Sequence, residues 1–197
     1  TQLTQGEAWH RIVMNDDFSR FYAYRTDINT PPVVTLNAIT THKKKGLNAS
    51  LVKTINESTR LKERINEYEI GKAEFIRVPN SKGDTLNGWM LKPAKFDPSK
   101  KYPVLFCNYG GPGSQRVSNR FGAVSFWHHL LAQKGFIVVS IDNTGTGYRG
   151  EEFKKKTYLQ LGKLEIEDQI DAAKYLGSMP FVDKNNIGHW GWSYGGF

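Results

Sequence analysis

A serine between glycines near the end of the sequence has the spacing of an activated nucleophile. Residues 191–195 read Gly-Trp-Ser-Tyr-Gly, which places Ser193 at the centre of a Gly-x-Ser-x-Gly motif. In such a motif the serine occupies a sharp turn between a strand and a helix, and the small residues around it leave room for neighbouring backbone. The motif alone also fits a turn of small residues, but a predicted strand at 186–190 runs directly into it and favours acyl transfer at Ser193.

The residues that would activate this serine do not follow it in the sequence. A serine hydroxyl is a poor nucleophile at neutral pH, so it needs a histidine as general base and a carboxylate that orients the histidine. With this motif the order along the chain is Ser, then Asp or Glu, then His. We therefore expect both partners to lie beyond Phe197 and the chain alone to show no turnover. All the histidines precede Ser193: His10, His42, His128, His129 and His189.

Acyl transfer also needs hydrogen-bond donors for the oxyanion of the tetrahedral intermediate. The backbone N–H of Tyr194, directly after the serine, is one candidate. The second lies in the segment 109–113, Tyr-Gly-Gly-Pro-Gly, which follows a predicted buried strand and carries the Tyr109 phenol. The structural alternative for Tyr109 is a tyrosine whose hydroxyl is satisfied locally beside the glycines. We predict that Tyr109 and Tyr194 form an oxyanion hole with Ser193.

Other polar clusters are interpreted as structural. His128 and His129 stand in a predicted helix without the partner spacing of a metal site. Glu165, Glu167 and Asp168 stand at the start of another predicted helix, where the helix dipole favours acidic side chains. We expect no metal site and no cofactor.

The composition argues against several classes of protein. The formal net charge is +8, but the lysines are spread along the chain except for short runs at 43–45 and 154–156, and no nucleic-acid-binding motif accompanies them. The single cysteine, Cys107, excludes an intrachain disulfide framework. No stretch approaches the roughly 18 uninterrupted apolar residues of a membrane span. We expect neither a nucleic-acid partner nor a membrane span in this chain.

Strands and helices that alternate from residue 71 onward must position the candidate site. This alternation is typical of an α/β layer with a mostly parallel central sheet. The helix predicted at 164–176 places Ile166, Ile170, Ala173 and Leu176 on one face. The predicted strands are 75–78, 88–91, 104–108, 136–141 and 186–190, and the predicted helices are 121–133 and 164–176.

The first seventy residues predict a different architecture, a four-stranded antiparallel meander. A single sheet of this size leaves a face uncovered, so we expect it to pack on neighbours as a β-propeller blade does. The sequence thus predicts two domains, the end of a propeller at 1–70 and an α/β domain at 71–197, with further blades upstream. The predicted strands are 9–14, 20–26, 33–39 and 50–55, with a polar hairpin tip at 41–48 and a linker or short helix at 57–68.

Several segments together resemble the dipeptidyl peptidase IV branch of the prolyl oligopeptidase family of serine peptidases. The resemblance covers most of residues 71–197, and one departure is Asn143-Thr144, where relatives often carry Gly-Arg. The segments that carry it are Tyr-Pro-Val-Leu at 102–105, Tyr-Gly-Gly-Pro-Gly-Ser-Gln at 109–115, Asp-Asn-Thr-Gly-Thr-Gly-Tyr-Arg-Gly at 142–150, Leu-Gly-Lys-Leu-Glu-Ile-Glu-Asp-Gln-Ile at 161–170 and Gly-Trp-Ser-Tyr-Gly-Gly at 191–196.

The resemblance implies a fold and a role for each site residue. The fold would be an α/β-hydrolase domain, cut just after the nucleophile and preceded by an antiparallel four-stranded propeller blade. Ser193 would be the nucleophile. The Tyr109 hydroxyl and the Tyr194 amide would form the oxyanion hole, and Trp192 would shape the wall of the substrate pocket.

The resemblance also implies an activity and partners. The whole protein would remove N-terminal dipeptides, with a preference for X-Pro or X-Ala, from peptides with a free N-terminus. It would need no cofactor, would form a homodimer, and would work in the periplasm or outside the cell. Two alternatives stay open: an acylaminoacyl peptidase or carboxylic-ester hydrolase of the same fold, and a non-catalytic peptide-binding scaffold.

Overall fold

The computed structural model describes residues 2–42 and 46–197, which fall into two compact units. Unit 1 comprises the residues up to Tyr68 together with Ser118–Ala123, and unit 2 comprises Glu69–Val117 and Val124–Phe197. Residues 43–45, the centre of the predicted hairpin tip at 41–48, lie outside the described residues. The candidate site residues all belong to unit 2.

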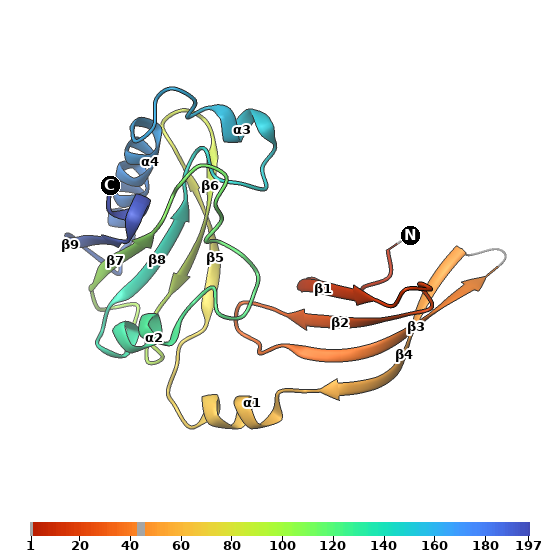
Figure 1. Ribbon diagram of the computed structural model, residues 1–197. Helices are drawn as coiled ribbons and strands as arrows, with labels where there is room; N and C mark the ends of the chain where they lie inside the picture. The colour runs from red at the N-terminus through yellow and green to blue at the C-terminus, as the bar shows by residue number, and fades with distance from the viewer. Residues whose placement is uncertain (1, 43–45) are drawn as a thin grey trace. The chain divides into compact units, whose positions relative to one another are not determined.

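Unit 1 is an antiparallel sheet with the strand order β1-β2-β3-β4 (Figure 1). Asn15 and Asp17 close the first hairpin, because their side-chain oxygens accept the backbone N–H groups of Arg20 and Ser19 at 2.8 and 2.9 Å. These bonds explain why both strand boundaries are found where the sequence predicted them. The elements are β1 (Trp9–Met14), β2 (Arg20–Thr26), β3 (Val33–His42), β4 (Gly46–Asn56) and the helix α1 (Thr59–Asn66).

The segment Ser118–Ala123 joins unit 1 through side-chain hydrogen bonds at the end of β2. The side chain of Asn119 accepts the N–H of Ile28 at 3.0 Å, and the Thr26 hydroxyl accepts the N–H of Phe121 at 3.3 Å. Thr26 and Ile28 are buried. Each bond satisfies a backbone donor at the point where the strand ladder stops, and this stabilises the strand end.

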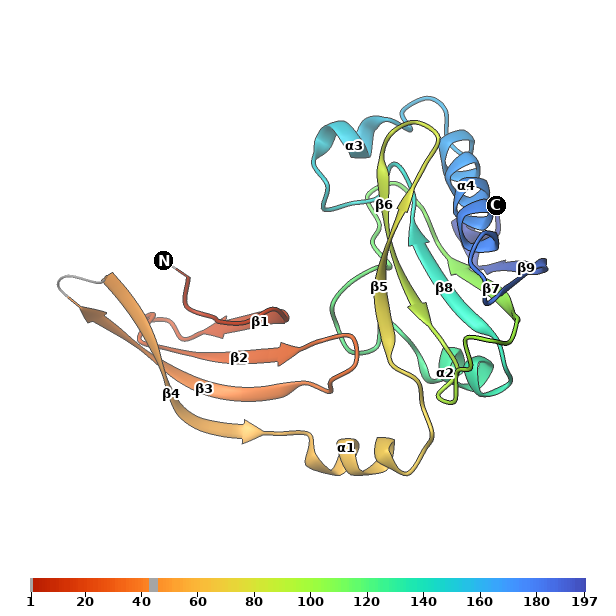
Figure 2. The ribbon, with the colours of Figure 1, turned by 180° about the vertical axis from the view of Figure 1, so that it is seen from behind.

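Unit 2 is built around a mixed sheet with the strand order β5-β6-β8-β7-β9. β7 pairs in parallel with β8 and β9, while β6 pairs antiparallel with β5 and β8 (Figure 2). The elements are β5 (Ala73–Pro79), β6 (Thr85–Leu91), β7 (Tyr102–Asn108), α2 (Phe126–Gln133), β8 (Ile137–Asp142), α3 (Glu151–Lys155), α4 (Lys163–Gly177), β9 (Val182–Gly191) and the short 3₁₀ helix η1 (Ser193–Gly196).

Helices cover both faces of this sheet. β8 is buried at each of its positions, so its side chains alternate between two apolar layers. On one face Trp89 packs against His128 of α2, with 5.2 Å between ring centroids. The other face packs against α4 in a cluster that includes Val78, Leu86, Val104, Phe106, Ile137, Val139, Ile141, Ala172 and Leu176.

The structure differs from the sequence prediction at two helices. The helix predicted at 121–133 begins at Phe126, because Ser125 caps it: the Ser125 hydroxyl accepts the N–H of His128, and the His128 ring accepts the N–H of Ser125 at 3.0 Å. The short helix α3 was not predicted. Its two lysines and Lys156 after them had indicated only a charged surface.

α4 buries only part of the predicted face, because Leu176 is buried while its two isoleucines are not. Ile166 and Ile170 are about half exposed, at 52% and 48%. They line a pocket of ≈ 320 Å³ together with Tyr109 and Tyr194. The buried face carries acidic side chains as well as apolar ones, because each buried acid has hydrogen-bond donors aimed at it. The buried residues of α4 are Leu164, Glu165, Asp168, Ala172 and Leu176.

Candidate active site

The backbone turns sharply at Ser193. Trp192 is extended, with φ −123° and ψ 147°, and Ser193 opens η1 with φ 55°. A positive φ at a residue with a Cβ costs about 1–3 kcal/mol and persists only where the surroundings enforce it. Ser193 is exposed. The predicted strand–turn–helix context of the serine is therefore present, with the strained backbone expected of a nucleophile elbow.

Gly191 and Gly195 stand where a side chain would collide with backbone. A Cβ on Gly191 would meet the carbonyl oxygen of Gly195. A Cβ on Gly195 would meet the carbonyl oxygen of Asn108 and would stand 3.0 Å from the Tyr109 Cα. The turn at Ser193 is thus packed directly against the end of β7, where the Tyr109 loop begins.

Replacing Gly195 by alanine is expected to lower turnover of the full-length protein by about 100-fold or more, because a misplacement of about 1 Å at the reacting group can cost this much. Gly196→Ala is the matched control, since the nearest atom to a Cβ there is the Gly191 carbonyl oxygen at 3.3 Å. We expect Gly196→Ala to cost less than about tenfold. Steady-state kinetics on both variants make the comparison, and equal losses would contradict the steric argument.

The Tyr109 side chain lies beside the turn. The centroid of the Tyr109 ring is 6.3 Å from that of the Tyr194 ring. The guanidinium of Arg116 lies 5.7 Å from the centroid of the Tyr109 ring. A Cβ on Gly111 would come within 2.8 Å of the Tyr109 ring, so the glycine lets the ring fold back over the loop. Within residues 2–42 and 46–197 neither the Tyr109 nor the Ser193 hydroxyl has a protein hydrogen-bond partner. Both hydroxyls are free to bind a ligand.

The far end of the Tyr109 loop is held by Asp142 at the end of β8. Its carboxylate accepts the N–H groups of Arg116 and Val117 at 2.9 and 3.0 Å. Burial raises the pKa of Asp142, while these two bonds act in the opposite direction. The loop is therefore tied to the sheet at both ends.

Tyr194 is oriented by helix α4. Its hydroxyl donates a hydrogen bond to Oε1 of Glu165 at 2.6 Å. Burial, and then the hydrogen bond to this carboxylate, raise the pKa of Tyr194 to about 12. Trp192 has 77% of its surface exposed. Ser193, Tyr109 and Tyr194 thus lie together, while the Trp192 indole extends into solvent.

The histidines whose side chains the structure describes do not contact Ser193. Nε2 of His189 lies 3.1 Å from the carbonyl oxygen of Gly195, and the ring stacks on Phe106. Burial lowers the pKa of His128 to about 4, so this cap of α2 is neutral at physiological pH. Among the described residues no histidine forms a hydrogen bond with the Ser193 hydroxyl.

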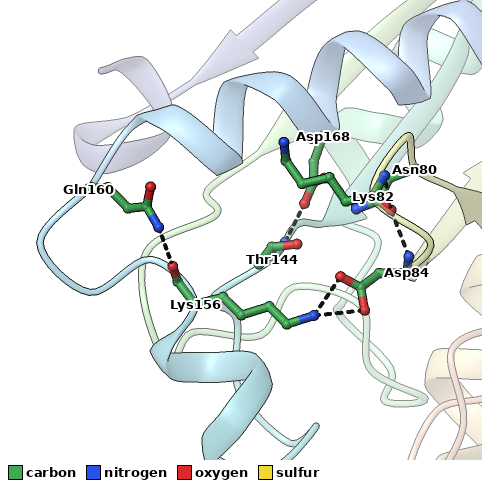
Figure 3. A network of polar contacts seen from close by, with 7 residues as sticks. All are labelled: Asn80, Lys82, Asp84, Thr144, Lys156, Gln160 and Asp168. Carbon is green, nitrogen blue, oxygen red and sulfur yellow. Dashed lines mark hydrogen bonds and ion pairs between the residues drawn. The ribbon is translucent and has the colours of Figure 1, made fainter.

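A network of polar contacts braces the loop that follows β8 (Figure 3). The Asp168 carboxylate, 1% exposed, accepts the N–H of Thr144 at 2.6 Å and the Asn80 amide at 2.7 Å. The Lys156 ammonium contacts both carboxylate oxygens of Asp84, at 2.8 and 3.0 Å. The β5–β6 turn, the loop at 143–144 and both following helices are therefore tied together.

Sequence reasoning missed the role of α4 at the site. Glu165, Asp168 and Gln169 were interpreted through the helix dipole or not at all, yet each has a partner far away in the sequence. The available signal was their spacing: these polar residues fall on the helical face that also carries Ala172 and Leu176. Polar side chains on a buried face need hydrogen-bond partners.

Two other features of the described part of the chain bear on its class. No cluster of three or more histidine, cysteine or acidic side chains there could hold a metal ion. No helix there is long and apolar enough to cross a membrane.

Comparison with known proteins shows the family to which the chain belongs. The model of the prolyl oligopeptidase family matches residues 123–197. Dipeptidyl peptidase 4 of Trichophyton equinum is 42% identical over 148 residues, which is 74% of this chain and 19% of that protein. Dipeptidyl peptidase 4 of Arthroderma otae is 39% identical over 148 residues, which is again 74% of this chain and 19% of that protein.

The fold is shared along the whole chain with a solved structure. The crystal structure of Porphyromonas gingivalis dipeptidyl peptidase 4 matches this chain with a TM-score of 0.89 and 38% identity. The match covers 100% of this chain and 27% of the Porphyromonas gingivalis chain. The predicted fold class, a propeller blade followed by part of an α/β-hydrolase domain, is confirmed. This chain spans about a fifth of the curated relatives that it matches. It belongs to the dipeptidyl peptidase IV branch of the prolyl oligopeptidase family.

Proposed function

We propose that residues 1–197 are part of a serine peptidase that removes dipeptides from the N-termini of peptides, with a preference for X-Pro or X-Ala. The observation that carries the proposal is the left-handed backbone of Ser193, packed against the start of the Tyr109 loop. This arrangement has the elements of an acyl-transfer site, and the relatives are named dipeptidyl peptidase 4.

In the proposed reaction the Ser193 oxygen attacks the carbonyl carbon of the second peptide bond. The hydroxyl proton passes to a histidine from a part of the whole protein beyond residues 1–197. The carbonyl oxygen takes up the negative charge and accepts hydrogen bonds from the Tyr109 hydroxyl and the Tyr194 amide. The C–N bond then breaks, and the histidine returns the proton to the leaving amine. Water hydrolyses the dipeptidyl ester and frees Ser193. Trp192 would form part of the pocket wall.

The rest of the whole protein supplies what this chain lacks. We propose that residues 1–70 are the end of a propeller and residues 71–197 the first part of the peptidase domain. Further parts would provide the base, its carboxylate and the acidic groups that hold the substrate's amino group. The substrates are then peptides with a free N-terminus, and the assembly implied by the resemblance is a homodimer.

Free and N-blocked X-Pro reporter substrates test this function on the full-length protein. We expect turnover of the free substrate and at least about 100-fold lower kcat/KM for the N-acetylated one, because the acidic groups would lose their charged partner. Turnover of the blocked substrate alone would contradict the dipeptidase function. Absence of turnover, together with no labelling by a fluorophosphonate, would indicate a non-catalytic scaffold.

A further inference from the structure

Two side chains of helix α4, Glu165 and Gln169, face the candidate site from successive turns. They are four residues apart, so they lie one above the other on the helix surface. Glu165 is 6% exposed, and Gln169 is partly buried. Glu165 binds Tyr194 directly, and Gln169 binds residues next to the Tyr109 loop.

Glu165 holds the half that contains Tyr194. Its Oε1 accepts the Tyr194 hydroxyl at 2.6 Å, and its Oε2 accepts the N–H of Gly162 at 3.1 Å. With both oxygens occupied, the carboxylate has one orientation, and it fixes the Tyr194 ring in turn. The Tyr194 backbone is already constrained by the turn at Ser193, so its amide has little freedom left.

Gln169 holds the half that contains Tyr109. Its Oε1 accepts the Asn108 amide at 2.6 Å, and its Nε2 donates to Oδ1 of Asn143 at 3.2 Å. The Asn143 amide donates to the carbonyl oxygen of Gly110 at 3.0 Å. Asn108 and Asn143 are buried, at 5% and 1% exposed. The residues on both sides of Tyr109 are therefore anchored, directly or through Asn143, to one glutamine.

Asn143 lies directly after β8, in the loop whose side chains reach the Tyr109 loop. An amide there carries the contact from Gln169 to the Tyr109 loop, and a glycine would not. The Tyr109 loop is thus connected to α4 by side chains that this sequence provides.

We propose that Glu165 and Gln169 are positioning residues that set the Tyr109 hydroxyl and the Tyr194 amide at a constant separation, with helix α4 as the common support. Oxyanion donors are effective only when they are oriented before the charge develops. Two donors on separate loops would move independently, whereas two donors tied to one helix move together. This inference rests on the proposed function.

The test measures kcat and KM of the full-length protein with a free X-Pro reporter. We expect Glu165→Ala and Gln169→Ala each to lower kcat by about tenfold with KM within about twofold, because the donors act on charge that is present only in the transition state. Glu165→Gln keeps an acceptor for the Tyr194 hydroxyl and should recover most of the rate. Glu167→Gln, which alters only the Lys82 ion pair on another face of α4, is the matched control and should match wild type.

A double-mutant cycle separates positioning from a general loss of stability. In a Tyr194→Phe background Glu165→Ala should lower kcat by less than about twofold, since its partner hydroxyl is already gone. A full tenfold loss in that background would overturn the role of Glu165. Wild-type kcat in both alanine variants would overturn the whole inference while leaving the proposed function intact.

Backbone hydrogen exchange provides a readout that does not depend on activity. Gln169→Ala should speed exchange in residues 109–113, and Glu165→Ala should speed it in residues 192–197, with Glu167→Gln unchanged. If the wild-type protein showed no turnover, the proposed function would fail and exchange alone would decide the positioning roles. Unchanged exchange in both segments would overturn them.

Discussion

Ser193→Ala in the full-length protein is expected to lower kcat by about 10⁴- to 10⁶-fold, the loss seen when the nucleophile of a serine hydrolase is removed. The acyl-enzyme route needs the Ser193 oxygen, because the other hydroxyl on the sharp turn that Gly191 and Gly195 permit, that of Tyr194, is bonded to Glu165. The residual rate would come from substrate binding and the oxyanion donors. Single-turnover kinetics and fluorophosphonate labelling measure the loss, and labelling should disappear.

The folded state should tolerate this change. Ser193 is exposed, and an alanine has the same backbone strain at φ 55° as a serine. The thermal unfolding midpoint should therefore stay close to that of wild type. Ser178→Ala is the matched control, because the Ser178 hydroxyl donates only to the Tyr175 carbonyl at the exposed end of α4. A Ser193→Ala variant within tenfold of the wild-type kcat would exclude Ser193 as the nucleophile.

The secondary structure was largely predictable because its signals are local. β8 is rich in apolar β-branched residues, interrupted only by Ser140 before its last residue Asp142, and Asn15 and Asp17 mark the turn after β1 with side-chain oxygens. The start of α2 was placed too early because Phe121 has helical spacing with the residues that follow. The helix starts where Ser125 and His128 form reciprocal hydrogen bonds, and the spacing of apolar residues does not reveal these bonds.

The candidate site was predictable only in part, because only some of its contacts are local in the sequence. The motif around Ser193 determines its own geometry over a few residues, so the serine and the amide of Tyr194 follow from the sequence. The partners of α4 do not. Asn108 and Gln169 are 61 residues apart, and Tyr194 and Glu165 are 29 apart. Such contacts depend on how the helix packs on the sheet, and of the predicted apolar face of α4 the two isoleucines are not buried.

The Tyr109 phenol should make a large and separable contribution to turnover. Tyr109→Phe in the full-length protein is expected to lower kcat by about 100-fold, as the loss of one oxyanion-hole donor does, with KM nearly unchanged. The hydroxyl acts on negative charge that develops only in the transition state, so its removal should spare substrate binding. Steady-state kinetics with a free X-Pro reporter separate the two constants.

The structure also predicts that this loss is not a loss of stability. The Tyr109 hydroxyl has no protein hydrogen-bond partner within the described residues, and a phenylalanine ring keeps the contacts with the Tyr194 ring and the Arg116 guanidinium. Tyr158→Phe is the matched control, since Tyr158 is 73% exposed, and it should leave both kcat and the unfolding midpoint unchanged. A wild-type kcat in Tyr109→Phe would leave the Tyr194 amide to stabilise the oxyanion without the phenol. The positioning of Tyr109 by Gln169 would then have no catalytic purpose.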